Sequence, residues 1–310
     1  MACYTPLQAW YSKEINTSGK RSLVFTHIYA LEPDNPITIA CGQCIGCRLE
    51  KSRQWAIRCI HESSLYEDNC FITLTFSPGV LQKRENPWSI DVRDYQLFMK
   101  KLRKKYGKGI RFFHCGEYGE KGGRPHYHAL LFNFDFKDKE LWKIENNQRY
   151  YISNELNNLW GKGHCVIGNV TFESAAYVAR YVMKKVNGEE KDAHYQWADP
   201  ETGEVFPLKP EYVTMSRRPG IGKKWYDKYH SDLYPKDYIT VNGKKCRPPK
   251  YYDNILKEAN PISFDKIHEA RQEKILDRQD ELTPSRLKIK EQIANRKLDR
   301  LLRSHDKDTL

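Results

Sequence analysis

Two histidines separated by one residue, His126 and His128, lie in the stretch Gly-Gly-Arg-Pro-His-Tyr-His-Ala-Leu-Leu-Phe, residues 122–132. The apolar run that follows them is typical of a central strand covered on both faces. Alternate residues of a strand point to the same face, so both imidazoles can reach one metal ion from one side of a sheet. On this short and common triplet alone, the alternative that the histidines only hydrogen-bond to their neighbours stays open.

A carboxylate, Glu117, ends the preceding strand-like segment, residues 110–117. Residues 120–125 are turn-like, rich in Gly and ending in Pro, so the two strands should form a hairpin that places Glu117 beside the histidine pair. Two imidazoles and one carboxylate, with positions left open, suit a catalytic Mg²⁺ or Mn²⁺ that engages a phosphate oxygen. His114 and Glu120 are further candidates for the third ligand, and Glu117 could also be an ordinary strand-end carboxylate.

Residues 171–186 predict an amphipathic helix with two tyrosines on its polar side. Tyr177, Tyr181 and Lys184 stand at i, i+4 and i+7, and therefore share one face. A tyrosine can attack a phosphodiester and form a covalent phosphotyrosine, and a lysine one turn away can stabilise the phenolate or the phosphate charge. Core packing is the weaker interpretation of the tyrosines, because another stripe already supplies the core: Ala175, Val178, Ala179, Val182 and Val186.

Taken in this order, the histidine pair, the upstream Glu117 and the helix with Tyr-x-x-x-Tyr-x-x-Lys resemble the HUH endonuclease superfamily. Within it, the chain is similar to the rolling-circle replication initiators of gokushovirus-type microviruses, which are phages with small single-stranded DNA genomes. The strand-like residues 71–76, the Cys-x-x-Cys-x-x-Cys element at 41–47 and Ser-Arg-Arg-Pro-Gly-Ile-Gly at 216–222 belong to the same resemblance. It covers roughly residues 1–230, and the order and spacing of the motifs make it specific.

The resemblance implies a metal held by His126, His128 and Glu117, with Tyr177 and Tyr181 as paired nucleophiles. The implied activity is that of a metal-dependent, sequence-specific single-stranded DNA endonuclease and strand transferase. Attack by one tyrosine leaves a 5′-phosphotyrosine and a free 3′-hydroxyl that primes replication, and later rejoining releases circular genomes. The implied substrate is single-stranded or supercoiled viral origin DNA.

Two alternatives to this function stay open at this point. An HUH transposase or plasmid initiator would use the same chemistry in a different biology. A non-catalytic, zinc-containing protein that binds single-stranded nucleic acid would use the cysteines and basic aromatic surface, but it has no need for the Tyr-Tyr-Lys face. The nucleotide-binding pattern Gly-x-x-x-x-Gly-Lys-Ser/Thr is absent from the sequence, so we expect a host helicase and the host replication machinery to unwind the duplex.

Four of the nine cysteines lie in the first 47 residues: Cys3, Cys41, Cys44 and Cys47. Two overlapping Cys-x-x-Cys units form a compact, thiolate-rich turn, and Cys3 would complete a tetrahedral Zn²⁺ site that ties down the N-terminal segment. Reduced structural cysteines and an iron–sulfur cluster are the alternatives.

The net charge of +12 is concentrated in residues 1–250, which carry +11, whereas residues 251–310 carry +1. A basic body with interleaved aromatic residues favours binding to unpaired nucleic acid over a merely solvating surface. The basic run at residues 100–105 suits either the C-terminus of a helix or a contact with DNA. We expect DNA contacts from Arg124, Arg180, Lys185, Arg217, Arg218, Lys223 and Lys224.

The predicted fold class is α+β, with a central antiparallel sheet of ferredoxin or RNA-recognition type flanked by helices, plus a helical C-terminal tail. The elements in order are strand 70–76, helix 91–106, hairpin 110–134, helix 154–160, strand 164–170 and the tyrosine helix. The polar residues 188–210 should form an excursion such as a hairpin, and the helical tail should break and restart at 283–285.

We expect a Cys-rich segment at 1–47, an HUH endonuclease domain at 48–232, and a linker with a charged helical tail at 233–310. No apolar run approaches the ~18 residues of a membrane span, and the N-terminus lacks the pattern of a secretory signal. We therefore expect no membrane partner and a location in the cytoplasm of the bacterial host.

Overall fold

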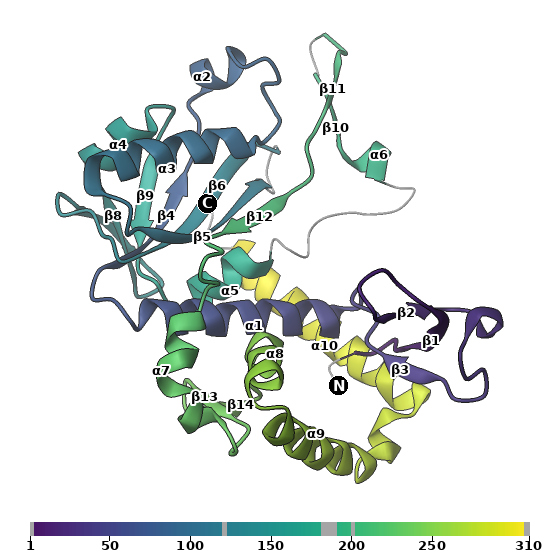
Figure 1. The fold of residues 1–310 in the computed structure, drawn as a ribbon. Helices are drawn as coiled ribbons and strands as arrows, with labels where there is room; N and C mark the ends of the chain where they lie inside the picture. Colours follow the sequence, from purple (N-terminus) through teal and green to yellow (C-terminus); the bar gives the residue numbers. More distant parts are fainter. Residues whose placement is uncertain (1–2, 120–122, 181–190, 200–201, 307–310) are drawn as a thin grey trace. The chain divides into compact units, whose positions relative to one another are not determined.

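The structure is a computed structural model that describes residues 3–119, 123–180, 191–199 and 202–306 (Figure 1). The chain divides into two compact units. One unit comprises Met1–Lys51 and Asp265–Leu310, and the other comprises Ser52–Phe264. The His-x-His stretch lies in the second unit, and the four N-terminal cysteines lie in the first.

The second unit is built on a seven-stranded sheet in which all neighbouring strands run antiparallel. The predicted α+β class with a large antiparallel sheet is therefore confirmed. In spatial order the strands are β12 (Tyr212–Met215), β5 (Arg111–Tyr118), β6 (Pro125–Phe132), β4 (Asn69–Leu74), β9 (Cys165–Gly168), β8 (Gln148–Ile152) and β7 (Glu140–Glu145).

Helices cover both faces of this sheet (Figure 1). Helices α3 (Val92–Tyr106) and α4 (Asn154–Trp160) pack on one face over Tyr127, Ala129 and Leu131 of β6. Helices α1 (Ile45–Ser63) and α5 (Phe172–Arg180) pack on the other face. Burial on both sides explains why β6 is apolar at nearly every position, and the predicted helices and central strands are confirmed.

The hairpin of β7 and β8 was not predicted from the sequence. Its turn residues Asn146 and Asn147 both have positive φ, at 49° and 59°. Two such residues form the type of tight turn that joins antiparallel strands, and Asn adopts this backbone conformation more readily than most residues. The Asn-Asn pair was therefore the sequence signal for this hairpin.

The N-terminal segment also holds a sheet that the sequence did not predict. It has three strands in the order β2 (Arg21–Val24), β1 (Leu7–Ile15) and β3 (Ile37–Ile39), all antiparallel. Most side chains of β1 and β2 are exposed, so these strands lack the apolar alternation that identifies a half-buried strand.

The predicted hairpin excursion near residues 188–210 and the break in the C-terminal helices before Pro284 are confirmed. Among the described residues, none of the helices combines the length and the apolar character that crossing a bilayer requires. The remaining elements are η1 (His27–Tyr29), α2 (Pro78–Gln82), α6 (Lys191–His194), β10 (Gln196–Ala198), β11 (Val205–Pro207), α7 (Lys223–Leu233), β13 (Ile239–Val241), β14 (Lys244–Cys246), α8 (Lys250–Ala259), α9 (Pro261–Leu276), η3 (Gln279–Leu282) and α10 (Pro284–Asp306).

A buried ion pair between Glu62 of α1 and Arg111 of β5 anchors the loop that precedes α7. Glu62 is fully buried, and its second carboxylate oxygen accepts the backbone N–H of Gly222 at 2.7 Å. Arg111 donates to the carbonyl of Pro219, also at 2.7 Å. One carboxylate and one guanidinium therefore connect a helix, a strand and the predicted basic loop.

Replacing Glu62 with Ala tests this connection. It leaves the buried Arg111 charge without its partner, so we expect the free energy of unfolding to fall by about 3–5 kcal/mol in urea denaturation. Asp68→Ala, which removes the partner of the exposed Lys137, is the control and should change stability little. Equal effects of the two substitutions would contradict the assigned role of Glu62.

Candidate active site

Glu117, His126 and His128 meet on one face of the sheet. The antiparallel register of β5 and β6 pairs Glu117 with His126 and Cys115 with His128. Glu117 Oε1 lies 2.7 Å from His126 Nε2 and 2.6 Å from His128 Nε2. Glu117 and His128 are buried and His126 is half-buried. The expected position of Glu117 beside the histidine pair is therefore confirmed, while its role as a ligand stays a prediction.

The opposite ring nitrogen of each histidine is held by a neighbour. His126 Nδ1 lies 3.0 Å from the carbonyl oxygen of Arg124, and this oxygen can only accept a hydrogen bond, so the proton is on Nδ1. His128 Nδ1 lies 2.9 Å from Thr73 Oγ1. Both Nε2 atoms thus face Glu117, and fixing Nδ1 in this way is how proteins orient imidazoles toward a metal.

The donor set fits a divalent cation. The three ligand atoms lie within 4.8 Å of one another. Glu117 Oε2 is buried and has no hydrogen-bond partner among the described residues, and a bound cation would satisfy this acceptor. Burial raises the pKa of Glu117, but hydrogen bonds from His126 and His128 outweigh burial and lower the pKa to about 2. The carboxylate is therefore an anion at neutral pH.

His114, the alternative third ligand, lies on the other face of the sheet. Its ring stacks on Tyr95 with centroids 3.5 Å apart, and its Nδ1 lies 2.9 Å from Thr214 Oγ1. Residues 114 and 117 are an odd number of positions apart in one strand, so their side chains point to opposite faces. The expectation for His114 was wrong for this reason, and Glu120 lies outside the described residues.

Tyr177 of α5 reaches the same carboxylate from above the sheet. Its hydroxyl donates to Glu117 Oε1 at 3.3 Å, and its ring meets that of His128 edge-on with centroids 5.0 Å apart. The opposite side of α5 is buried, as predicted for Ala175, Val178 and Ala179. Three other predicted site residues lie outside the described residues: Tyr181, Lys184 and Lys185.

The predicted DNA-contacting residues fall into two groups. Arg124 donates from its Nη2 to the carbonyl of Phe76, and the Arg180 guanidinium lies 5.6 Å from the centroid of the Tyr177 ring. The second group belongs to the loop before α7 and to the first turn of that helix. There Arg217, Arg218 and Lys224 are exposed, and Lys223 pairs with Asp227. Contact of either group with DNA stays a prediction.

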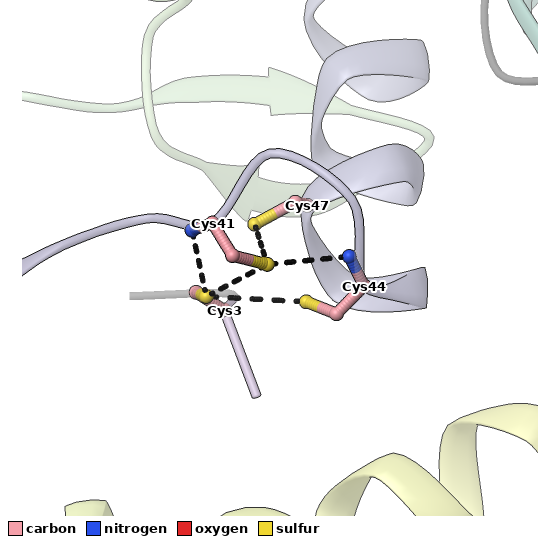
Figure 2. A group of neighbouring side chains, drawn as sticks. All are labelled: Cys3, Cys41, Cys44 and Cys47. Carbon is pink, nitrogen blue, oxygen red and sulfur yellow. Dashed lines mark hydrogen bonds between the residues drawn. The ribbon is translucent and has the colours of Figure 1, made fainter. Parts of the chain in front are cut away.

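The four N-terminal cysteines converge in the first unit (Figure 2). Cys3 Sγ lies 3.6 Å from Cys41 Sγ and 3.9 Å from Cys44 Sγ, and the sulfurs of Cys41 and Cys47 are 4.0 Å apart. Backbone N–H groups of Tyr4 and Cys44 point at two of these sulfurs. The predicted grouping of the four cysteines is therefore confirmed, including Cys3.

These sulfur separations fit a single tetrahedral ion. Zinc–sulfur bonds of about 2.3 Å in a tetrahedron place the sulfurs about 3.8 Å apart. Burial raises the pKa of the Cys41 thiol, but hydrogen bonds, first of all from the Thr5 hydroxyl, outweigh burial and lower the pKa to about 6. Cys41 is therefore a thiolate, which is the metal-binding form, at neutral pH.

Sequence reasoning missed Thr73 and Glu62, which position the site and the basic loop. Thr73 faces His128 because β4 and β6 pair these two residues. They are 55 residues apart in the chain, so only the register of two distant strands reveals the contact. Glu62 is 160 residues from Gly222 and has no local signal in the sequence.

Comparisons with known proteins identify the family. The model of a family of replication-associated proteins of the ORF2 type matches residues 69–186, which include the histidine pair, Glu117 and Tyr177. The chain is 33% identical to Replication-associated protein VP4 of Bdellovibrio phage phiMH2K over 272 residues, 84% of this chain and 79% of that protein. It is 32% identical to Replication-associated protein ORF2 of Spiroplasma virus 4 over 249 residues, 76% and 73% of the two chains.

A third relative, Replication-associated protein ORF4 of Chlamydia phage 1, is 27% identical over 230 residues, 71% of this chain and 54% of that protein. The chain belongs to this family of viral replication-associated proteins, as the resemblance to microvirus initiators predicted. No solved structure matches the chain significantly.

Replacing Glu117 with Gln tests whether the buried carboxylate stabilises the fold as an anion. The folded-state pKa of about 2 lies below the ordinary value of 4.5. The contribution of Glu117 to the free energy of unfolding is therefore complete above about pH 4.5 and is lost as the pH falls toward 2. We expect metal-free wild-type protein to lose more stability over this window than Glu117→Gln does, as measured by urea denaturation in EDTA. Parallel pH profiles would contradict the low pKa.

Proposed function

We propose that the chain is a rolling-circle replication initiator of HUH type, a metal-dependent and sequence-specific endonuclease and strand transferase for single-stranded DNA. The observation that carries the proposal is the position of the Tyr177 hydroxyl 3.3 Å from Glu117, whose carboxylate also contacts His126 and His128. A nucleophile and a metal-binding set therefore adjoin each other in the segment that matches the replication-associated family.

The proposed reaction is a transesterification. The phenolic oxygen of Tyr177 attacks the scissile phosphorus and loses its proton, and the bond from phosphorus to the 3′-oxygen breaks. The products are a 5′-phosphotyrosine and a free 3′-hydroxyl, so no water or other co-reactant is consumed. Mg²⁺ or Mn²⁺, held by Glu117, His126 and His128, would polarise the phosphate.

Tyr177 is held in place by its surroundings before substrate arrives. Its ring packs edge-on against both His128 and Phe71, with centroid separations of 5.0 Å and 6.5 Å. The buried side of α5 fixes the direction in which the phenol points, and this positioning lowers the entropy lost on reaching the transition state.

Tyr181 and Lys184 complete the proposed machinery. Tyr181 would act as the second nucleophile and allow the second cleavage and the rejoining that releases a circular genome. Lys184 would stabilise a phenolate or the phosphate charge.

The arrangement of the central strands supports an HUH-type, ferredoxin-like domain. The chain order β4-α3-β5-β6-α4-β9 is a β-α-β-β-α-β succession, and the four strands lie side by side in the order β5-β6-β4-β9. We propose that this domain spans residues 48–232, between a Cys-rich segment at 1–47 and a linker with a charged tail at 233–310.

We propose that the four cysteines bind Zn²⁺. Sulfurs less than 5 Å apart suit one ion, whereas an iron–sulfur cluster of several metal atoms needs more widely spaced ligands. The ion would join Cys3 to the turn formed by Cys41, Cys44 and Cys47, and so fix the N-terminal segment.

The proposed partners are viral origin DNA, single-stranded or supercoiled, and a host helicase with the host replication machinery. The proposed place of action is the cytoplasm of the bacterial host. A non-catalytic nucleic-acid-binding role and an HUH transposase or plasmid-initiator role are the alternatives, and the outcomes of the following experiment separate the non-catalytic role from the catalytic ones.

A labelled random-sequence library of single-stranded oligonucleotides, incubated with the protein in Mg²⁺ or Mn²⁺, tests the nuclease. We expect a covalent adduct that survives denaturing electrophoresis and maps by mass spectrometry to Tyr177 or Tyr181. Each single Tyr→Phe variant should keep some cleavage, since the other phenol remains. The double variant and the variant His126→Ala/His128→Ala should form no adduct.

Tyr229→Phe is the matched control, because it removes a phenol from α7 rather than from α5, and it should behave as wild type. Binding of DNA without any adduct would favour the non-catalytic alternative. Attachment at a serine, or at a tyrosine outside residues 172–186, would refute the mechanism.

The zinc proposal is tested by metal analysis of freshly purified protein. We expect about one equivalent of zinc, lost when Cys41, Cys44 and Cys47 are jointly replaced by Ser. Replacement of the buried Cys59, which lies outside the cluster, by Ala should leave the zinc content unchanged. Protein with neither zinc nor iron would show that the four residues are plain thiols.

A further inference from the structure

A lysine-lined groove runs between α3 and α4, on the face of the sheet opposite the His–Glu site. It consists of a wide hollow of about 690 Å³ and a smaller one of about 220 Å³. Both hollows are lined by Lys101, Lys104 and Leu159, so they form one continuous depression, here named the α3–α4 groove. None of the residues assigned above to metal, tyrosine chemistry or DNA contact lines it.

The groove is strongly basic. Two carboxylates, Asp94 and Glu155, line it against five lysines, and each carboxylate already pairs with one of these lysines. Lys100 and Lys104 have no ion-pair or hydrogen-bond partner within the described ranges of the chain, and they stand one turn apart on the same side of α3. The five lysines are Lys100, Lys101, Lys104, Lys105 and Lys162.

The helix dipole does not explain this charge. Its attraction for cations is confined to the last turn of a helix, and α3 ends at Tyr106. Lys100 and Lys101 precede that turn, and Lys162 is not part of α3 at all. Lysines four residues apart repel each other and destabilise a helix unless a polyanion compensates them. The groove is therefore better explained as a binding surface for phosphates.

The floor of the groove indicates an unpaired strand rather than a duplex. Leu97, Phe98, Leu159 and Trp160 lie beneath the lysines. A single strand presents apolar base faces together with its phosphates, so it can use such a floor and such a rim at once. A duplex presents phosphates outward and keeps its bases stacked inside.

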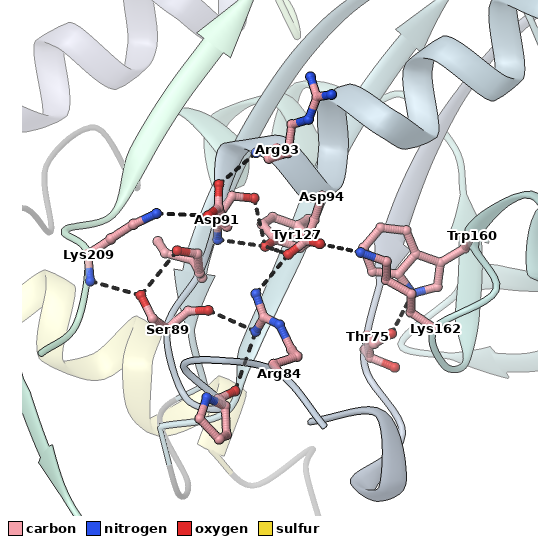
Figure 3. Close-up of polar contacts among 12 residues, drawn as sticks. Thr75, Arg84, Ser89, Asp91, Arg93, Asp94, Tyr127, Trp160, Lys162 and Lys209 are labelled. Carbon is pink, nitrogen blue, oxygen red and sulfur yellow. Dashed lines mark hydrogen bonds and ion pairs between the residues drawn. The ribbon is translucent and has the colours of Figure 1, made fainter. Parts of the chain in front are cut away.

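One end of the groove lies close to the His–Glu site. Lys162 pairs with Asp94, which also binds Arg84 and the Tyr127 hydroxyl (Figure 3). The backbone carbonyl of Lys162 accepts the N–H of Ser77 at 2.8 Å. This segment follows the end of β4, which also carries Thr73 beside His128.

Residues 75–77 thus form a narrow rim between the groove and the site. From the site side, Arg124 donates to the carbonyl of Phe76, two residues before His126. From the groove side, Trp160 donates to the carbonyl of Thr75 at 2.6 Å. Gly163 packs so closely on the rim that an added Cβ would lie 2.5 Å from the Thr75 oxygen, so the contact requires glycine.

We propose that the α3–α4 groove binds the single-stranded DNA that flanks the cleavage point. The strand leaves the His–Glu site over residues 75–77, and its phosphates contact Lys100 and Lys104. This inference rests on the proposed nuclease function, which supplies the strand. It adds a second binding surface that keeps the free 3′-end close while the 5′-end is held covalently.

Fluorescence anisotropy with fluorescein-labelled dT30 at several salt concentrations tests the groove. Each lysine–phosphate contact with a single strand contributes about 0.7 to the slope of log K against log salt. For Lys100→Ala/Lys104→Ala we therefore expect weaker binding and a slope shallower by about 1.4. Alanine favours helix, so α3 should stay folded, and an unchanged circular dichroism melting curve checks this.

The control variant Lys236→Ala/Lys244→Ala removes the same charge from exposed positions outside the groove and should keep the wild-type slope. A wild-type slope in the groove variant would overturn the inference. An equal change of slope for a dA30·dT30 duplex would overturn the assignment to unpaired DNA. The adduct assay run in parallel separates the two proposals, because a wild-type protein that forms the adduct while both slopes coincide refutes the groove alone.

Discussion

The antiparallel register of β5 and β6 is the constraint on which the site depends. It places Glu117 opposite His126 and, two residues along, His128 beside the same carboxylate. Because side chains alternate between the faces of a strand, a slip by one residue would move Glu117 away from both imidazoles. Burial of β6 on both faces makes such a slip costly, since its apolar residues fill the cores on either side. The same packing that stabilises the sheet therefore holds the three candidate ligands together.

The two faces of the sheet differ in what they offer to a nucleic acid. The face under α1 and α5 carries the carboxylate, the imidazoles and a phenol, all arranged for chemistry at one phosphate. The face under α3 and α4 carries lysines above apolar side chains and no comparable set of ligands among its described residues. The rim at residues 75–77 is short enough to let one strand contact both. A protein that holds one DNA end covalently and must keep the other end near benefits from such an arrangement.

Long-range polar contacts fix the parts that the sheet does not. Glu62 and Arg111 join α1, β5 and the loop before α7, so the exposed Arg217 and Arg218 project from an anchored backbone. In the other unit, the cysteine cluster joins Cys3 to a turn some forty residues later. Both devices replace an extended apolar core by a few strong contacts, which suits segments with many exposed residues.

The sequence by itself determined the local parts of this protein: the histidine pair, Glu117 at the hairpin, the buried stripe of α5 and the cysteine turn. Each of these follows from periodicity or from spacing within a few residues, which one strand, helix or turn is enough to express. The tertiary structure alone decided that Thr73 orients His128, that Glu62 anchors Gly222, and that lysines of α3 face α4 across a groove. The physical reason is that these contacts join residues distant in the chain, whose meeting depends on strand register and helix packing rather than on any local pattern.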